Sequence, residues 1–320
     1  LLNLIRKHIE QAGGPEALKL KEVPTPKVKP GWSLVRVKGF GINHSEIYTR
    51  KGESPTVKFP RILGIECVGE VADTTESDRL PVGQKVVSIM GGMGREFDGG
   101  YAEYALLPNE QIYPVNTKLS WPELAAIPET YFTAYGSLKN AHIDTAKSLL
   151  VRGATSGVGS AAIKLAKAMD PSITITGSTR HEEKFDKLRA IGCDKPVLDK
   201  DGKVQTEDHF DAIIELVGSA TLNDSLSHLN QFGYCCLTGG LGDQWTVPNF
   251  SAFVIPNGAS LTTFGSGIAS NDSAFNDMLN LIETHHIDVK PTQTFDLAHT
   301  GDAQAALEAS DSFGKVVVLP

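Results

Sequence analysis

LLVRGATSGVG, residues 149–159, is the most informative segment of this chain. The apolar run at residues 148–152 is typical of a short buried strand, and the glycines after it are typical of a tight turn. Apolar residues then recur at 158, 161, 162, 165, 166 and 169, which is the spacing of one helix face. A strand, a glycine-rich turn and a helix in this order predict a turn that binds the pyrophosphate of a dinucleotide.

The match to the G-x-G-x-x-G fingerprint is partial, because Ala154 and Ser156 stand at its first two glycine positions. Ala154 is small enough for a tight turn, and the hydroxyl of Ser156 can donate to a phosphate oxygen. A glycine-rich loop without a ligand is the alternative, but the flanking strand and helix favour a cofactor site. The residues expected to bind the cofactor here are Gly153, Ala154, Thr155, Ser156, Gly157, Val158 and Gly159.

The residues after the next strand predict the kind of cofactor. Sites for NAD carry an acid at the end of this strand, which binds the ribose 2′-hydroxyl. Here residues 173–176 run instead into Gly177-Ser178-Thr179-Arg180, with Lys184 beyond. Ser178, Thr179, Arg180 and Lys184 are therefore expected to bind a 2′-phosphate, which favours NADPH. A solvated basic loop is the alternative reading.

Outward from the turn, strands alternate with helices. We expect strands at 173–176, 212–217 and 233–238, and helices at 182–191 and 220–229. Such repeated units predict a doubly wound parallel sheet with right-handed crossovers, which we place at residues 124–264. The cofactor site is expected to extend to Leu216, Val217, Gly239, Gly240 and Leu241.

The rest of the chain has a β-rich texture. Residues 33–38, 67–71 and 85–89 are short apolar or alternating runs separated by glycine and proline, which predicts a small barrel or sandwich. Near the end we expect helices at 275–284 and 302–309 and a strand at 315–319. Residues 1–123 and 265–320 are therefore assigned to one domain.

Composition and charge limit the functions to consider. Hydrophobic residues make up 41% of the 320 residues and charged residues 21%, as in soluble globular proteins of two domains. The net charge of −8 argues against a nucleic-acid partner. No apolar run is long enough to span a membrane, and the short apolar start does not resemble a secretory signal. We expect a cytoplasmic protein with reduced cysteines.

Five further segments carry a resemblance to a known family: GINHSEIYTRKG at 41–52, FPRILGIECVGEV at 59–71, DGGYAEY at 98–104, ETYFTAY at 129–135 and GKVVVL at 314–319. Together with the glycine-rich turn, they resemble the medium-chain dehydrogenase/reductase superfamily, above all its zinc-independent quinone oxidoreductase branch. The resemblance implies an α/β protein with a GroES-like β-rich catalytic domain and a Rossmann domain, assembled as a homodimer or homotetramer.

The resemblance also implies the residues near the nicotinamide, which are Asn43, Tyr48 and Thr133. The alternative, purely structural roles are a turn residue for Asn43, a packed aromatic ring for Tyr48 and a helix cap for Thr133. Zinc-dependent relatives have a Cys in the segment of Asn43 and a His in the segment of Ile65, so no metal site is expected here.

The resulting hypothesis is NADPH-dependent hydride transfer to a small-molecule quinone or conjugated enone. Two alternatives stay open. One is reduction of an enoyl thioester, for which Arg50, Lys51, Lys58 and Arg61 could form a basic patch. The other is a non-catalytic NADPH-binding sensor.

Overall fold

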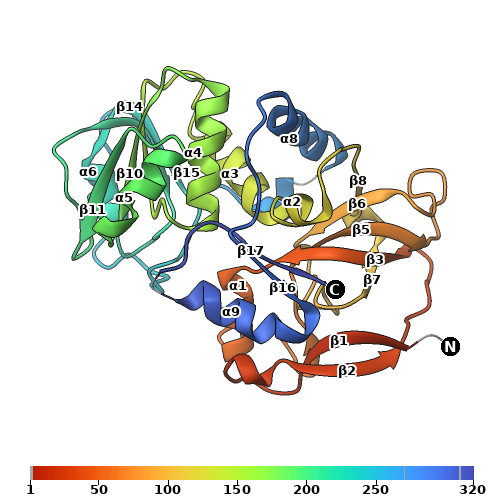
Figure 1. Ribbon diagram of the computed structural model, residues 1–320. Helices are drawn as coiled ribbons and strands as arrows, with labels where there is room; N and C mark the ends of the chain where they lie inside the picture. Colours follow the sequence, from red (N-terminus) through yellow and green to blue (C-terminus); the bar gives the residue numbers. More distant parts are fainter. Residues whose placement is uncertain (1–2, 270, 310) are drawn as a thin grey trace. The chain divides into compact units, whose positions relative to one another are not determined.

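The computed structural model describes residues 3–269, 271–309 and 311–320, and its chain folds into two compact units (Figure 1). The first unit comprises the chain up to Glu129 together with residues 266–280 and 288–320. The second comprises residues 130–265 and 281–287. The first unit thus extends to Glu129, past the boundary at residue 123 expected from the sequence, and residues 281–287 fall in the second unit although the sequence placed them in the first. The backbone N–H of Glu129 donates to Glu66 Oε2 at 2.8 Å, a contact within the first unit.

The first unit is the β-rich part, as the sequence predicted. One sheet has the strand order β16-β17-β3-β5-β6-β8, with β7 paired to β3, and a smaller sheet has the order β2-β1-β4. The strands are β1 (Asn3–Ile9), β2 (Lys19–Pro24), β3 (Trp32–Gly41), β4 (Arg61–Ile62), β5 (Glu66–Asp73), β6 (Lys85–Ile89), β7 (Tyr104–Pro108), β8 (Tyr113–Pro114), β16 (Gln293–Asp296) and β17 (Val316–Leu319).

The helices of the first unit cover parts of these sheets. They are α1 (His44–Lys51), α2 (Trp121–Ala125), the start of α3 (Pro128–Asn140), α7 (Ser266–Ala269), most of α8 (Asp272–Thr284) and α9 (Thr300–Glu308). The core gathers the inward side chains of β3, where Val35 and Phe40 are fully buried. The ring of Phe40 stacks on that of Tyr101 with centroids 4.7 Å apart.

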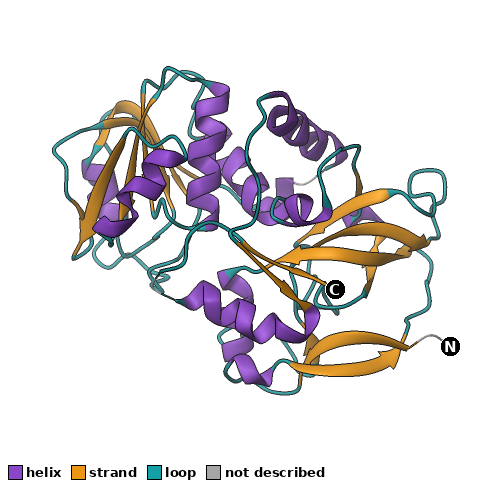
Figure 2. Ribbon diagram, viewed as in Figure 1, coloured by secondary structure: helices purple, strands orange, loops and turns teal. Residues whose placement is uncertain are grey.

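The second unit is a doubly wound sheet surrounded by helices (Figure 2). Its strand order is β12-β11-β10-β9-β13-β14-β15, and all neighbours are parallel except the short β12. The strands are β9 (Ser148–Arg152), β10 (Thr174–Thr179), β11 (Lys195–Lys200), β12 (Lys203–Val204), β13 (Phe210–Glu215), β14 (Leu229–Leu237) and β15 (Ser260–Thr263). Numbered from β9, the parallel strands follow the 3-2-1-4-5-6 order of dinucleotide-binding domains.

Helices α4 (Gly157–Met169), α5 (Phe185–Ala190) and α6 (Leu222–Ser227) pack on this sheet with the rest of α3. The predicted apolar face of α4 is confirmed, since Ala161, Ala162 and Leu165 are buried. Short 3-10 turns occur at Pro15–Ala17, Asn109–Gln111, Glu182–Lys184, Ala252–Val254 and Leu297–His299. Within the described ranges, no helix is both long and apolar enough to cross a membrane.

Gly159 on α4 packs against the backbone of the preceding turn. A Cβ at this position would lie 2.5 Å from the carbonyl oxygen of Gly153 and 2.7 Å from Cα of Ala154. We expect Gly159→Ala to lower the free energy of unfolding, because the clash costs about 1–3 kcal/mol and outweighs a gain in helix propensity of about 1 kcal/mol. Urea unfolding of the two proteins measures the difference.

The matched control for this substitution is Gly265→Ala in the same unit. A Cβ on Gly265 has no heavy atom within 4 Å, and its φ is not in the left-handed region. We expect this variant to unfold like the original protein. Equal stability of the Gly159→Ala and Gly265→Ala proteins would contradict the close packing of α4 on the turn.

Candidate functional site

The glycine-rich turn lies between the carboxyl end of β9 and the start of α4. Gly153 has a φ of +80°, which favours glycine. The backbone N–H groups of Gly153 and Ala154 donate to Ser178, to its Oγ at 3.2 Å and to its carbonyl oxygen at 3.0 Å. Ser178 is fully buried. The hydroxyl that the sequence assigned to a 2′-phosphate therefore supports the turn from within the protein.

Ser156 is the N-cap of α4. Its Oγ donates to the carbonyl oxygen of Gly153 at 2.8 Å and accepts from the N–H of Gly159 at 3.0 Å. This hydroxyl is thus used inside the turn and is not directed at a phosphate, in contrast to the expectation from sequence. The N–H groups of Gly157 and Val158 have no acceptor in the part of the chain that the structure describes. Free N–H groups at the start of a long helix fit the pyrophosphate of a dinucleotide.

The loops after β13 and β14 meet at the same edge of the sheet. A Cβ on Gly153 would touch Leu216, Leu241 and Val217 at 3.4–3.6 Å. The N–H of Leu241 donates to the carbonyl oxygen of Leu216 at 3.1 Å, which joins the two loops. Beside them, Gly240 faces the ring of Trp245. The structure therefore gathers the predicted cofactor residues of three strands around one turn.

Arg180 is the exposed cation among the residues assigned to the 2′-phosphate. Thr179 and Lys184 are buried, like Ser178, whereas Arg180 is exposed just beyond β10. Over the described ranges Arg180 makes no hydrogen bond or ion pair. Its guanidinium is exposed to solvent, so of the four residues predicted to contact a 2′-phosphate it is the one whose charged group is accessible to an anion.

Arg152, directly before the turn, is a functional candidate that the sequence reasoning missed. It is fully buried and binds Asp199 through two bonds, from Nε to Oδ2 at 2.7 Å and from Nη2 to Oδ1 at 3.0 Å. Its Nη1 also donates to Asp224 Oδ2 at 2.7 Å. This network ties the ends of β9 and β11 to α6 beneath the turn. The available signal was an arginine inside an apolar strand, where charged residues are rare unless paired.

Asn43 in the first unit lies where β3 gives way to α1, and it is half-buried. Its Oδ1 accepts a hydrogen bond from Lys315 Nζ at 2.7 Å, and its Nδ2 donates to Glu66 Oε1 at 2.8 Å. Lys315 Nζ also donates to Glu66 Oε1 at 2.8 Å. The three side chains meet because β17, β3 and β5 are neighbours in the sheet. The sequence pointed to Asn43 but not to its two charged partners.

The carboxylate of Glu46 joins the segment of Asn43 to two other segments of the first unit. It accepts hydrogen bonds from the N–H of Asn43 at 3.0 Å, the N–H of Ile65 at 2.7 Å and the hydroxyl of Tyr101 at 2.6 Å. Gln304 in turn donates to the Tyr101 hydroxyl at 3.1 Å. Burial raises the pKa of Glu46 to about 7, although the bonds from Tyr101 and Ile65 oppose the rise.

The other two residues assigned to the nicotinamide lie on helices. Tyr48 is half-buried on α1 in the first unit. Thr133 is buried on α3 in the second unit, and its carbonyl oxygen accepts from Ser137 Oγ at 2.7 Å. The roles of Asn43, Tyr48 and Thr133 toward a ligand stay predictions.

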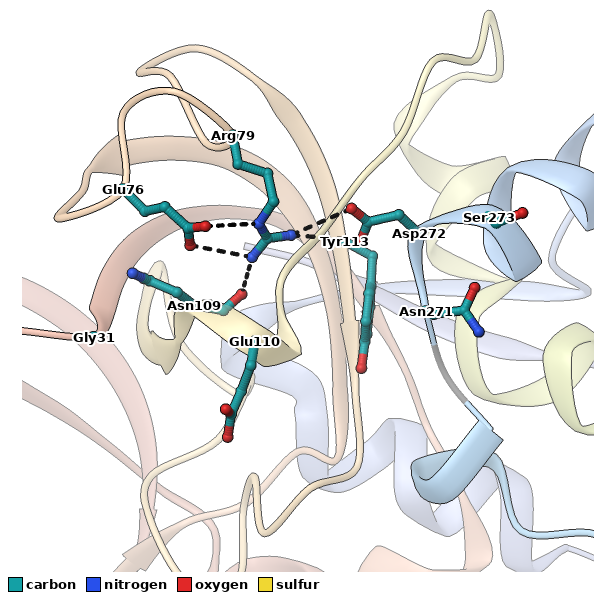
Figure 3. Close-up of a pocket in the computed structure, with 9 residues that line it drawn as sticks. All are labelled: Gly31, Glu76, Arg79, Asn109, Glu110, Tyr113, Asn271, Asp272 and Ser273. Carbon is teal, nitrogen blue, oxygen red and sulfur yellow. Dashed lines mark hydrogen bonds and ion pairs between the residues drawn. The ribbon is translucent and has the colours of Figure 1, made fainter.

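A separate polar cavity in the first unit contains none of the predicted site residues. Figure 3 shows Arg79 pointing toward Glu76 and Asp272, with which it forms ion pairs at 3.1 Å and 3.4 Å. Its Nη1 also donates to the carbonyl oxygen of Ile112 at 2.9 Å. This arginine connects the start of α8 to the β-strands of the first unit. We therefore interpret the cavity as the space around a structural ion-pair network.

Comparisons with known proteins agree with this architecture. Residues 29–117 match the alcohol dehydrogenase GroES-like domain, and residues 191–318 match the zinc-binding dehydrogenase family. A quinone oxidoreductase of Pongo abelii is 33% identical over 239 residues, which cover 72% of this chain and 71% of that protein. A NAD-dependent alcohol dehydrogenase of Sulfurisphaera tokodaii is 26% identical over 344 residues, covering 95% of this chain and 96% of that protein.

The fold is also similar to that of a mycobacterial protein solved in complex with NADPH. The TM-score is 0.84 at 22% sequence identity, and the match covers 99% of this chain and 100% of that one.

We expect Glu46 to make the stability of the protein depend on pH. A carboxyl whose pKa is raised on folding binds its proton more tightly in the folded than in the unfolded chain. Its contribution is therefore present below about pH 4.5 and is lost as the pH rises through about 7. Relative to Glu46→Gln, the original protein should lose stability between pH 5 and pH 8.

Urea unfolding of both proteins across this range measures the effect. Glutamine does not titrate, so the pH dependence of the difference belongs to Glu46. A difference in free energy of unfolding that stays constant from pH 5 to pH 8 would show that Glu46 keeps an ordinary pKa.

Proposed function

Because the chain belongs to the quinone oxidoreductase branch of the medium-chain dehydrogenase/reductase superfamily, we propose that it is an NADPH-dependent reductase of quinones or conjugated enones. The observation that carries the proposal is the pair of hydrogen bonds made by the side chain of Asn43. Its carboxamide is fixed by a carboxylate and an ammonium group. The family resemblance implies that Asn43 lies in the segment where zinc-dependent members carry a cysteine ligand. Such a site can bind the oxygen of an acceptor that is already electrophilic.

The second unit supplies the cofactor site in this proposal. The N–H groups of Gly157 and Val158 bind the pyrophosphate, and the apolar side chains of Leu216, Val217 and Leu241 line the turn around Gly153. Exposed Arg180 binds the 2′-phosphate, a geometry that guanidinium suits well. When bound, NADPH supplies the hydride, and the protein supplies its position and surroundings.

Zinc has no role in the proposal, because the residues present do not suit it. Asn43 and Ile65 stand at the ligand positions, and isoleucine has no donor atom. Oδ1 of Asn43 already accepts a hydrogen bond from the ammonium of Lys315, whose positive charge would repel a metal cation. The part of the chain that the structure describes holds no cluster of three or more His, Cys, Asp or Glu suited to a metal, and the four cysteines are buried.

The chain's own residues then act by positioning. Asn43 donates a hydrogen bond to the acceptor oxygen, and Tyr48 donates to the enolate or phenolate oxygen that develops there. Thr133 orients the nicotinamide. Most of the rate gain comes from holding donor and acceptor in contact. We also propose a homodimer or homotetramer and a cytoplasmic location.

A reductase of enoyl thioesters is less well supported. The basic patch that the sequence offered for a pantetheine substrate is largely neutralised. Arg50 and Lys51 both pair with Glu308, at 2.8 Å and 2.7 Å, and Arg61 pairs with Asp98 at 3.3 Å. The similarity to NAD-dependent alcohol dehydrogenases makes alcohol oxidation the competing activity to test.

The first test of the proposed function is oxidation of NADPH and of NADH with a benzoquinone, a phenanthrenequinone and a conjugated enone, in the presence of a chelator. We expect turnover that is faster with NADPH and insensitive to the chelator. Oxidation of simple alcohols that is abolished by chelation would replace the proposal by a metal-dependent dehydrogenase. Tight binding of NADPH without turnover of any acceptor would instead support the alternative of a non-catalytic NADPH-binding sensor.

The second test addresses Arg180. Loss of one exposed charge-assisted contact should weaken NADPH binding about tenfold in Arg180→Ala and leave NADH binding unchanged. Titration of cofactor fluorescence measures both dissociation constants. The matched control is Arg189→Ala on α5 of the same unit, whose exposed guanidinium pairs with Asp186. Equal weakening by the two variants would point to a general charge effect and against a 2′-phosphate contact.

A further inference from the structure

We propose that Lys315 and Glu66 form a positioning pair that fixes and polarises the carboxamide of Asn43, so that Asn43 presents a single N–H donor to the acceptor oxygen. This inference rests on the proposed function, since it assigns to Lys315 and Glu66 the orientation of the Asn43 side chain for hydride transfer. Neither charged residue was a candidate from the sequence.

The orientation of the Asn43 amide follows from the chemistry of its partners. A carboxylate only accepts hydrogen bonds and an ammonium group only donates them. Nδ2 must therefore face Glu66, and Oδ1 must face Lys315, as the distances of 2.8 Å and 2.7 Å indicate. A flipped amide would set an N–H against the ammonium and an oxygen against the carboxylate. The amide has one N–H left, which has no partner among the described residues.

The neighbouring residues bury the pair of Lys315 and Glu66 and fix its position. Glu66 is fully buried, Lys315 is 6% exposed, and Glu66 Oε2 is occupied by the N–H of Glu129 at 2.8 Å. Gly41 on β3 leaves the space, because a Cβ there would lie 2.3 Å from both Glu66 Oε1 and Lys315 Cε. Replacing a buried ion pair with apolar residues often leaves stability unchanged or higher. Among the described residues, the only other side chain that hydrogen-bonds to this pair is Asn43, which points to a role at that amide.

The chemical role concerns the charge that develops during the reaction. The ammonium of Lys315 withdraws electron density from Oδ1 of Asn43, which makes the remaining N–H a stronger donor. A bound nicotinamide cofactor in its reduced form would supply the hydride and its two electrons to the acceptor carbon, and the acceptor oxygen would then take up negative charge. The N–H stabilises that charge without giving up its proton, as a donor of an oxyanion hole does. The proton that completes the reduced product comes from Tyr48 or water.

A double-mutant cycle on Asn43 and Lys315 tests whether the lysine acts through the asparagine. We expect Asn43→Ala to lower kcat for quinone reduction by roughly 100-fold, as for loss of an oxyanion donor. Lys315→Met should produce a loss of similar size with unchanged NADPH affinity. The double variant should lose no more than Asn43→Ala alone, because a group that acts only through Asn43 has nothing left to act on.

The matched control is Lys7→Met. Lys7 is also 6% exposed and lies in the same unit, but its Nζ donates to the backbone oxygens of Ala298 and Leu18 at 2.6 Å and 3.4 Å. We expect this variant to lose stability and to keep kcat. A loss of kcat equal to that of Lys315→Met would assign both effects to general destabilisation.

Two conservative variants keep the test decisive if Lys315→Met does not fold. Lys315→Arg keeps the charge and the donors and should retain kcat within about threefold. Glu66→Gln removes the anion that orients Nδ2 and should lower kcat about as far as Asn43→Ala. Unchanged kcat in Lys315→Met or Glu66→Gln, or losses that multiply in the double variant, would overturn the positioning pair.

Failure of this inference can be separated from failure of the proposed function. If the original protein reduces quinones with NADPH but Asn43→Ala reduces them equally well, the function stands and the pair has no such role. If the original protein reduces no quinone or enone, the proposed function itself fails.

Discussion

Three hydrogen bonds to the buried carboxylate of Glu46 set the geometry of the first unit's site. They join the backbone of Asn43 to the backbone of Ile65, two positions that lie on separate segments of the chain. A carboxylate without access to water is stable only when donors replace its hydration, and the Tyr101 hydroxyl supplies the third. This one buried group therefore fixes the backbone of Asn43 relative to the segment of Ile65, next to Glu66.

Each unit places a buried charge network next to the residues that we propose as ligand contacts. In the first unit, Lys315 and Glu66 lie behind Asn43. In the second, Arg152 binds Asp199 and Asp224 beneath the glycine-rich turn. Such networks are costly to bury but specify one arrangement, because each donor has an acceptor in only one geometry. This suits sites that must hold small groups within narrow limits of distance.

The sequence predicted what depends on local spacing. The helix of residues 157–169 and the turn before it could be predicted because the periodic apolar positions and the glycines are close in the chain. The sequence could not reveal that Ser178 Oγ faces inward, because that depends on the depth of a turn relative to the next strand. Nor could it pair Lys315 with Asn43, since the two are separated by the whole second unit. The basic patch was misjudged for the same reason, because Glu308 lies far along the chain from Arg50.

The discontinuity of the first unit has a consequence for biosynthesis. During translation, Asn43 and Glu66 leave the ribosome long before Lys315 and the strand β17 that follows it, while β9 to β15 become available as an uninterrupted series. The second unit can therefore complete its sheet while the first still lacks β16 and β17. Until β17 pairs with β3, Lys315 is not held beside Glu66, so the amide of Asn43 can be oriented only after the segment of Lys315 has been synthesised.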